Sequence, residues 1–275
     1  MAANSCTKNS SANEPFIEDP SQDFPGNDDN SENTGSISGE RSYKSFSHLD
    51  SITIRANLPH QLKDYTGFTV SFNKENHTPN YVVWELLGSE IKNDVDRSDY
   101  FWQDPDIDGC PAHSDYTHSG YDRGHMCPAA DQKWSLQAME DCFVMANMCP
   151  QDHDLNAGAW LTLETKERQW AQRDSCIMIV AGPIYTDSDT DRIGQIGVRV
   201  PSAFFKAFLA PYVKTPRAIA FVYPNMTSPG NMEQYAMSID DLESLIGFDL
   251  FPTLPDEIED VVEAEFSFTE WNRSK

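Results

Sequence analysis

One short segment, residues 122–160, constrains this 275-residue chain more than any other part of the sequence. It contains His125, and it brings Asn156 near the start of an expected helix. A neutral histidine can take a proton from water, and an amide oxygen can bind a hard divalent cation without adding negative charge. With arginines close by, the segment has the groups needed to hydrolyse a phosphodiester with one metal ion.

His125 is the candidate general base for such a reaction. Gly124 before it and Pro128 after it predict a loop or a bent strand that aims the imidazole at a substrate. A histidine in isolation is more often a satisfied structural residue, so the neighbours carry the argument. Arg123 has two interpretations that the residues alone leave open: a guanidinium placed for phosphate, or a surface charge paired with Asp122.

The helix expected from Leu155 to about Arg173 carries the second group of candidates. A spacing of four residues would place four side chains on one stripe of this helix: Asn156, Trp160, Glu164 and Arg168. Asn156 would bind the metal, Glu164 would hold water on it, and Arg168 would grip a phosphate. The competing interpretations are a helix cap for Asn156, with Glu164 and Arg168 forming an ordinary i,i+4 ion pair. Trp160 is expected to anchor the helix in the core.

The net charge of −24 is unusual for a protein that approaches a polyanion, since phosphate contacts normally come from clustered Lys and Arg. The acids gather at the ends of the chain. Residues 1–40 carry −7 and residues 240–275 carry −9, which leaves −8 for the residues between them. A local basic site is therefore compatible with the composition, and the acidity keeps a small phosphodiester or nucleotide as an alternative substrate.

Residues 1–45 are expected to form a disordered, acidic and polar leader or tether, followed by a single domain over residues 46–272. The leader has too little apolar content to offset the entropy of ordering. No apolar run of about 18 residues occurs, so no membrane span is expected.

Cys6 and the polar residues after it resemble the start of a bacterial lipoprotein, which would carry a lipid anchor. These signs predict a bacterial cell envelope, periplasm or secreted location, with the cytoplasm as the alternative.

Five of the six cysteines lie between residues 110 and 176. In an oxidising compartment, two disulfides among Cys110, Cys127, Cys142, Cys149 and Cys176 would fix the loops around the candidate site. A structural zinc site is a weaker alternative, because the spacing of its ligands fits no common module. Those ligands would be Cys110, His113, His118 and Cys127.

From residue 51 onward, apolar runs alternate with turns, an order typical of an α+β fold with helices packed on a central sheet. Content of β-branched and aromatic residues predicts strands at 51–58, 81–86, 176–185, 206–213 and 218–223. Good helix formers without internal proline predict helices at 135–141, 155–173 and 238–245.

The ordered motifs resemble the DNA/RNA non-specific endonuclease family. Asp122-Arg123-Gly124-His125 is followed by Pro128-Ala129-Ala130-Asp131, and Asn147 lies nine residues before Asn156. Glu164 lies seventeen residues after Asn147. The resemblance extends over nearly all of residues 50–255, through further blocks at 81–84, 97–104, 182–185, 200–206 and 239–251.

The resemblance implies a ββα-metal nuclease core with a central, mainly antiparallel sheet flanked by helices. By this likeness His125 is the general base on a β-hairpin, and Asn156 on the following helix is the direct ligand of Mg²⁺, or of Mn²⁺ in its place. Glu164 would act on the metal through water. The implied activity is cleavage of DNA and RNA without sequence preference, leaving 5′-phosphate ends.

The same likeness makes Arg97, Arg123 and Arg168 contacts for substrate phosphates, while Asn147 either holds the histidine loop or approaches the scissile group. The chain departs from the family in its acidity and at Cys127 and Cys149. A hydrolase of another phosphodiester on the same core, or a non-catalytic nucleic-acid-binding homologue, is the alternative function.

Overall fold

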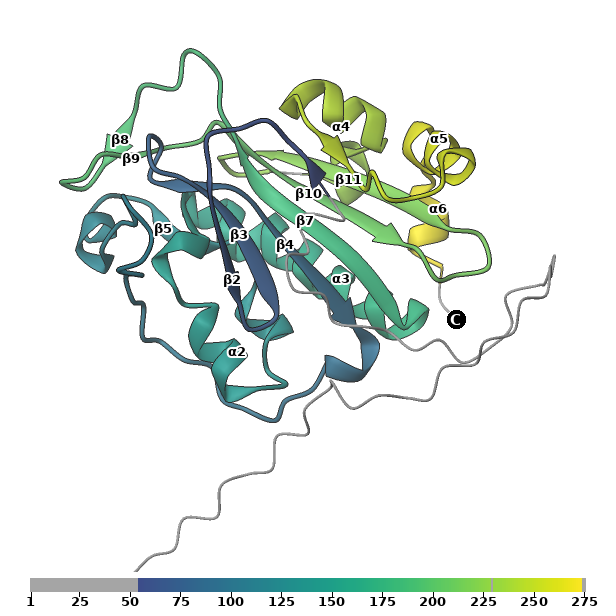
Figure 1. Cartoon of the computed structure of the whole chain (residues 1–275), viewed down its shortest axis with the longest axis horizontal. Helices are drawn as coiled ribbons and strands as arrows, with labels where there is room; N and C mark the ends of the chain where they lie inside the picture. Colours follow the sequence, from purple (N-terminus) through teal and green to yellow (C-terminus); the bar gives the residue numbers. More distant parts are fainter. Residues whose placement is uncertain (1–53, 229, 274–275) are drawn as a thin grey trace, which may run out of the picture. The chain divides into compact units, whose positions relative to one another are not determined.

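One seven-stranded antiparallel sheet organises the described part of the chain, which comprises residues 54–228 and 230–273 of a computed structural model (Figure 1). Across the sheet the strands follow the order β12 (Ala236–Met237), β11 (Arg217–Pro224), β10 (Ala203–Ala210), β7 (Cys176–Ile184), β4 (Thr78–Leu87), β3 (Phe68–Asn73) and β2 (Gln61–Tyr65). Three two-stranded pairs are separate from it: β1 (Ile54–Arg55) with β13 (Asp249–Leu250), β5 (Asp122–His125) with β6 (Met148–Gln151), and β8 (Arg192–Ile193) with β9 (Val198–Arg199).

The large sheet is buried on both faces, and strand β4 shows why. Val82 and Trp84 belong to one hydrophobic cluster, whereas Tyr81 and Val83 belong to a second. Successive side chains of a strand point to opposite faces, so the two clusters lie on the two sides of the sheet. A sheet covered on both faces requires strands that are apolar throughout, as the fully buried residues 176–183 of β7 illustrate.

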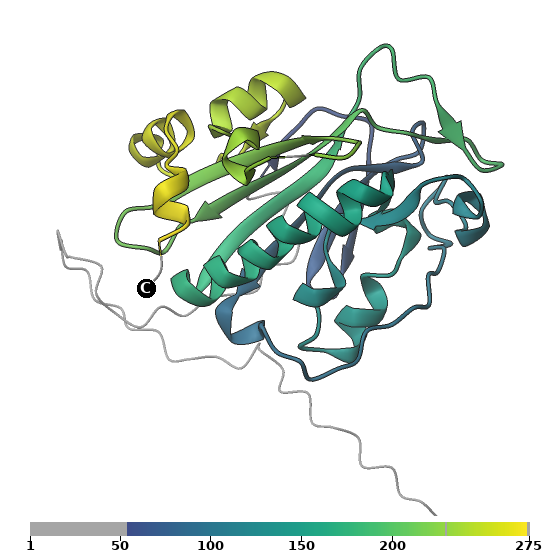
Figure 2. The ribbon, with the colours of Figure 1, turned by 180° about the vertical axis from the view of Figure 1, so that it is seen from behind.

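Helices cover both faces of this sheet. Figure 2 shows the long helix α3 (Leu161–Asp174) lying across one face, while α4 (Ile239–Ile246) and α5 (Asp256–Ala264) pack on the second cluster on the other face. Helix α3 continues directly from a π-helical segment, η5 (Leu155–Trp160). In the part of the chain that the structure describes, the remaining helices are α2 (Leu136–Asp141), α6 (Phe268–Trp271) and the short 3₁₀ segments η1 (Gly88–Glu90), η2 (His113–Tyr116), η3 (Ala129–Asp131), η4 (Met145–Asn147) and η6 (Met232–Tyr235).

The predicted α+β class with a central antiparallel sheet flanked by helices is confirmed. The strands predicted at 81–86, 176–185 and 218–223 and the helices predicted at 135–141, 155–173 and 238–245 are all present within a few residues. The strand predicted at 206–213 lies at Ala203–Ala210, because Pro211 cannot donate to the ladder. Of the strand predicted at 51–58, only Ile54–Arg55 is formed within the described residues.

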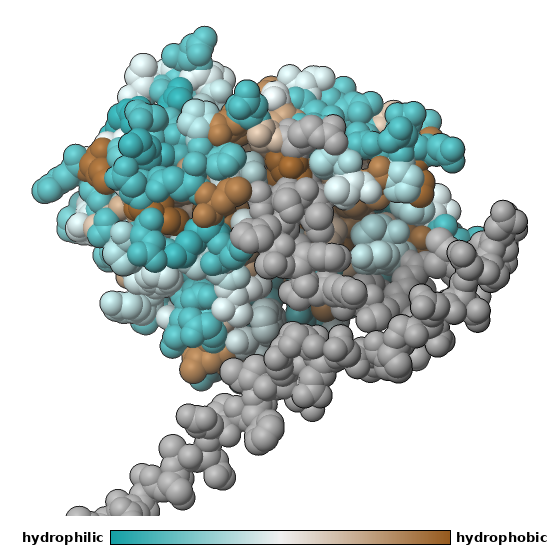
Figure 3. All heavy atoms as spheres, viewed as in Figure 1, coloured by the Kyte–Doolittle hydropathy of each residue, from teal (hydrophilic) through white to brown (hydrophobic). Residues whose placement is uncertain are grey.

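The acidic leader predicted for residues 1–45, including Cys6, lies outside the described residues. Within the described part of the chain, no helix is both long and apolar enough to span a bilayer. On the face drawn in Figure 3, hydrophilic side chains are interspersed with small hydrophobic patches. Isolated exposed apolar residues of this kind are normal on a folded protein and need no partner.

Candidate active site

The candidate site is built on a ββα unit formed by β5, β6 and the η5–α3 helix. The two strands pair antiparallel, with His125 opposite Met148 and Gly124 opposite Cys149. Gly124 is required by a close approach, because an added Cβ would lie 2.2 Å from the Oε1 atom of Gln151 and 2.6 Å from its Cβ. The chain then runs from β6 into the helix, so His125 and Asn156 come from adjacent elements of one compact unit.

His125 is a buried, neutral histidine with one free ring nitrogen. Its side chain is only 8 % exposed and lies against Phe101 and Phe143, with ring centroids 5.7 and 4.8 Å away. The imidazole forms a hydrogen bond with the backbone of Arg123, and Nε2 has no partner among the described residues. Burial, followed by the positive charges of Arg97 and Arg123, lowers the pKa of His125 to about 3. The lone pair on Nε2 is therefore available to accept a proton.

Asn147 holds the loop that follows His125. Its Oδ1 accepts the backbone N–H of Cys127 at 2.9 Å, and its Nδ2 donates to the carbonyls of Cys127 and Cys142, each at 2.9 Å. Asn147 is fully buried and does not line the cleft in front of His125. Of the two roles considered for Asn147, this placement supports the one in which it holds the histidine loop.

Asn156 lines the cleft, and its amide nitrogen is already engaged. The Nδ2 atom donates to the Asp122 carboxylate at 2.9 Å, while Oδ1 has no donor within the described residues. Asp122 also accepts a hydrogen bond from His153 at 2.9 Å. The helix is capped by Asp152, whose carboxylate accepts the N–H groups of residues 154 and 155, so Asn156 is not the cap.

Five of the predicted site residues line one cleft: Arg97, Arg123, His125, Asn156 and Glu164. Glu164 is 9 % exposed, and burial raises its pKa, while Lys206, Arg168 and Arg97 oppose the rise. The amide oxygen of Asn156 and the carboxylate of Glu164 are hard oxygen donors, which is the chemistry that Mg²⁺ or Mn²⁺ requires. The donor set therefore fits a hard divalent cation.

The three predicted arginines are placed differently. The Arg97 guanidinium lies over the Phe143 ring at 5.0 Å and that of Arg123 over the Phe101 ring at 4.6 Å, so both flank the histidine. Arg168 does not line the cleft and pairs with the buried carboxylate of Asp131 at 3.0 Å. The competing i,i+4 ion pair with Glu164 is not formed either, because the Arg168 guanidinium is engaged by Asp131 across the fold.

A buried ion pair beneath the site was not predicted from the sequence. The Lys206 ammonium lies 3.0 Å from the carboxylate of Glu167, and both side chains are fully buried. Lys206 also lies over the rings of Trp84 and Trp160, at 5.2 and 4.7 Å. Trp160 is confirmed as a core anchor, and its Nε1 donates to the His125 carbonyl at 3.3 Å. A single lysine within the apolar run 203–210 was the available signal for this pair.

The five cysteines in the described part of the chain are free and buried, so the expected disulfides are not formed. Burial raises the pKa of the Cys110 thiol to about 12, and raises those of Cys127 and Cys149 well above their usual range. Neutral, desolvated thiols are poor nucleophiles, which identifies Cys127 as a packed small hydrophobe. The zinc set considered above is not brought together among the described residues.

Comparison with known proteins identifies the family. Residues 49–257 match the model of the DNA/RNA non-specific endonuclease family, and the chain belongs to this family. It is similar to the human mitochondrial nuclease EXOG, with 35% identity over 210 residues that cover 69% of this chain and 56% of the relative. It is also similar to the mitochondrial nuclease of Saccharomyces cerevisiae, with 30% identity over 222 residues that cover 71% of this chain and 67% of the relative.

A solved structure supports the fold. A chain from the crystal structure of the EndoG/EndoGI complex superposes with a TM-score of 0.68 at 24% identity, covering 78% of this chain and 95% of that one. Among the sequence relatives, coverage is smaller: this chain spans a little over half the length of the human nuclease.

These relatives correct the predicted localisation. The human, mouse and two yeast relatives are mitochondrial by name, so the prediction of a bacterial cell envelope, periplasm or secreted location is wrong. The prediction rested on Cys6 within a polar segment. Polar sequence around one cysteine is common in leaders of any destination, and it carries little information about acylation.

Proposed function

We propose that this protein is a metal-dependent endonuclease that hydrolyses phosphodiester bonds of DNA and RNA without sequence preference and leaves 5′-phosphate ends. The observation that carries this proposal is the unpartnered Nε2 of a neutral, buried His125 at a cleft that also contains an amide oxygen, a carboxylate and two arginines. Membership of the DNA/RNA non-specific endonuclease family supports the same activity.

Each residue of the cleft has a distinct role in this proposal. Arg97 and Arg123 bind the substrate phosphate, and His125 takes a proton from the attacking water through Nε2. Asn156 holds Mg²⁺, or Mn²⁺ in its place, through Oδ1, and Glu164 contributes through water. When bound, the cation polarises the phosphate and stabilises the charge on the departing 3′ oxygen.

The two arginines also connect substrate binding to base strength. Their positive charges contribute to the low pKa of His125, after burial itself. A phosphate bound between Arg97 and Arg123 compensates these charges, so the pKa of His125 should rise when substrate binds. The histidine would then become a stronger base in the complex than in the free protein, which suits a base that acts near neutral pH.

Asp122 completes the site by orienting the metal ligand. Its carboxylate accepts a hydrogen bond from the Asn156 amide nitrogen, which leaves the amide oxygen of this cleft residue free to bind the cation. A carboxylate in this position also adds negative charge near the cation without occupying a ligand position. Such supporting groups tune metal affinity in many proteins.

The test is digestion of supercoiled plasmid and of single-stranded RNA by the full chain with Mg²⁺ and with EDTA. His125→Ala should lower the cleavage rate by about 10²–10⁴-fold without loss of fold, because it removes only the base. Asn156→Ala should abolish metal-supported turnover. His60→Ala, at an exposed histidine outside the cleft, is the matched control and should cleave at the wild-type rate.

The outcomes separate the alternatives. Wild-type cleavage by His125→Ala would refute the assigned base. Turnover of a small model diester with intact plasmid and RNA would indicate a hydrolase of another phosphodiester. Nucleic-acid binding without any cleavage would indicate a binding homologue.

A further inference from the structure

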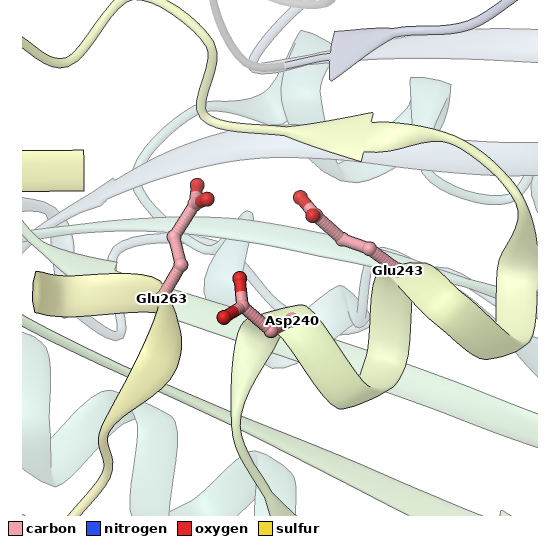
Figure 4. A group of neighbouring side chains, drawn as sticks. All are labelled: Asp240, Glu243 and Glu263. Carbon is pink, nitrogen blue, oxygen red and sulfur yellow. The ribbon is translucent and has the colours of Figure 1, made fainter. Parts of the chain in front are cut away.

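Three carboxylates converge on the opposite side of the sheet from α3, at the contact between α4 and α5 (Figure 4). Asp240 and Glu243 lie one turn apart on α4, and Glu263 lies near the end of α5. One oxygen from each side chain lies within 4.8 Å of the others. Figure 4 shows that all three carboxylates point into the same space.

Glu263 distinguishes this group from an ordinary acidic surface. Its side chain is only 7 % exposed, and its Oε1 atom is buried without a hydrogen-bond partner. A desolvated carboxylate normally requires a donor or a cation, because its hydration is lost on burial. No lysine or arginine of the described chain forms an ion pair with it.

The groups that act most strongly on the Glu263 carboxyl are acidic. Burial and the neighbouring acids Glu243, Glu259, Asp249 and Asp240 raise the pKa of Glu263 to about 8. Glu243 has one oxygen engaged, since Oε1 accepts the N–H of Leu250 at 2.6 Å. The other oxygen of Glu243 and those of Asp240 and Glu263 have no lysine or arginine of the described chain paired with them.

We propose that Asp240, Glu243 and Glu263 bind one calcium ion that joins α4 to α5. Opposed ligand oxygens of a calcium ion are about 4.6–5.2 Å apart, given its usual bond lengths, whereas those of magnesium are about 4.0–4.2 Å apart. The ligand oxygens lie within 4.8 Å of one another, a span that one calcium ion at its usual bond lengths can bridge between opposed ligands. Calcium also accepts irregular oxygen sets completed by water, which suits a site with three protein ligands.

The site is separate from the proposed catalytic cleft. None of its residues lines that cleft, and Glu263 lies beyond residue 257, where the match to the family model ends. The ion would fasten helix α5, whose apolar side includes Val262, to α4 and the second hydrophobic cluster. Its expected effect is on the stability of this region and not on the chemistry of cleavage.

Thermal unfolding of the full chain with CaCl₂, with MgCl₂ and with EDTA tests the proposal. Calcium at about ten times its Kd should raise Tm by roughly 3–6 °C, and magnesium should raise it less. Glu263→Gln and Asp240→Asn should lose this shift. Glu257→Gln, at an exposed acid of the same helix α5, is the matched control and should retain it.

Calorimetric titration with CaCl₂ then assigns the site. Glu263→Gln should bind one calcium ion fewer than the wild type. Asn156→Ala should still bind the calcium ion between α4 and α5, because Asn156 lies in the catalytic cleft and not in this site. The proposal would be overturned if calcium did not change the Tm of the wild type. It would also be overturned if calcium raised the Tm of both Glu263→Gln and Asp240→Asn by as much as it raises that of the wild type. If Glu263→Gln does not fold, Asp240→Asn at the exposed ligand decides alone. None of these readouts depends on nuclease activity.

Discussion

Asn147→Ala tests how the histidine loop is held. The substitution removes three hydrogen bonds, each 2.9 Å long, and leaves the N–H and carbonyl of Cys127 and the carbonyl of Cys142 without their partner. Each such bond contributes about 1 kcal/mol net, and stripping buried groups of their partners adds to the loss. The free energy of unfolding should therefore fall by about 3–5 kcal/mol. Turnover should also fall, by up to about 10²-fold, because the loop after His125 loses its support.

Urea unfolding followed by tryptophan fluorescence measures the first effect, and plasmid cleavage at a temperature where the variant is folded measures the second. Asn93→Ala, at an exposed asparagine, is the control and should change the free energy of unfolding by less than about 0.5 kcal/mol. A loss of activity in Asn147→Ala with wild-type stability would refute the supporting role. It would favour direct action of the amide on the substrate.

Three further predictions concern the same unit. The pKa of His125 is about 3 in the folded protein and about 6.5 in the unfolded chain. The stability that comes from keeping His125 neutral is therefore complete above pH 6.5 and is lost as the pH falls toward 3. Between pH 7 and 5, urea titrations should show the free energy of unfolding of the wild type falling by about 2 kcal/mol more than that of His125→Gln. Arg123→Ala should reduce the slope of log binding affinity for nucleic acid against log salt concentration by about 1. Arg168→Ala should leave this slope unchanged. It should instead lower the free energy of unfolding by about 3–5 kcal/mol in the same urea assay. Gly124→Ala should cost about 1–3 kcal/mol through its clash with Gln151, visible as a lower Tm.

The parts of the fold that could be predicted are those with a strong local signal. Strands β4, β7 and β11 are apolar runs bounded by turns, and the helix over 155–174 lacks proline and glycine-rich breaks after its first turn. His125 and Asn156 could be assigned to one site from the ordered motifs that resemble the endonuclease family, although η3, α2 and η4 separate β5 from β6 in the chain. Only the connection from β6 to the helix that carries Asn156 is short.

The parts that could not be predicted depend on contacts distant in sequence. Lys206 and Glu167 are 39 residues apart, and only the folded sheet brings them together beneath the site. Arg168 was assigned to the cleft by assuming a regular α-helix from Asn156 onward. Glu164 and Arg168 do lie four residues apart on the regular helix α3, and Glu164 lines the cleft, so the helical spacing itself holds. Arg168 instead meets Asp131, which is 37 residues away.

The reactivity of the buried thiols can be used to measure local unfolding of this protein. Cys127 and Cys142 lie under the histidine loop, Cys149 is on β6, and Cys176 begins β7. A thiol reagent can reach each of them only when the surrounding segment opens, so labelling rates under native conditions report the opening free energy at four positions. Mass spectrometry of the labelled peptides would show whether the ββα unit opens independently of the large sheet, without the introduction of any probe.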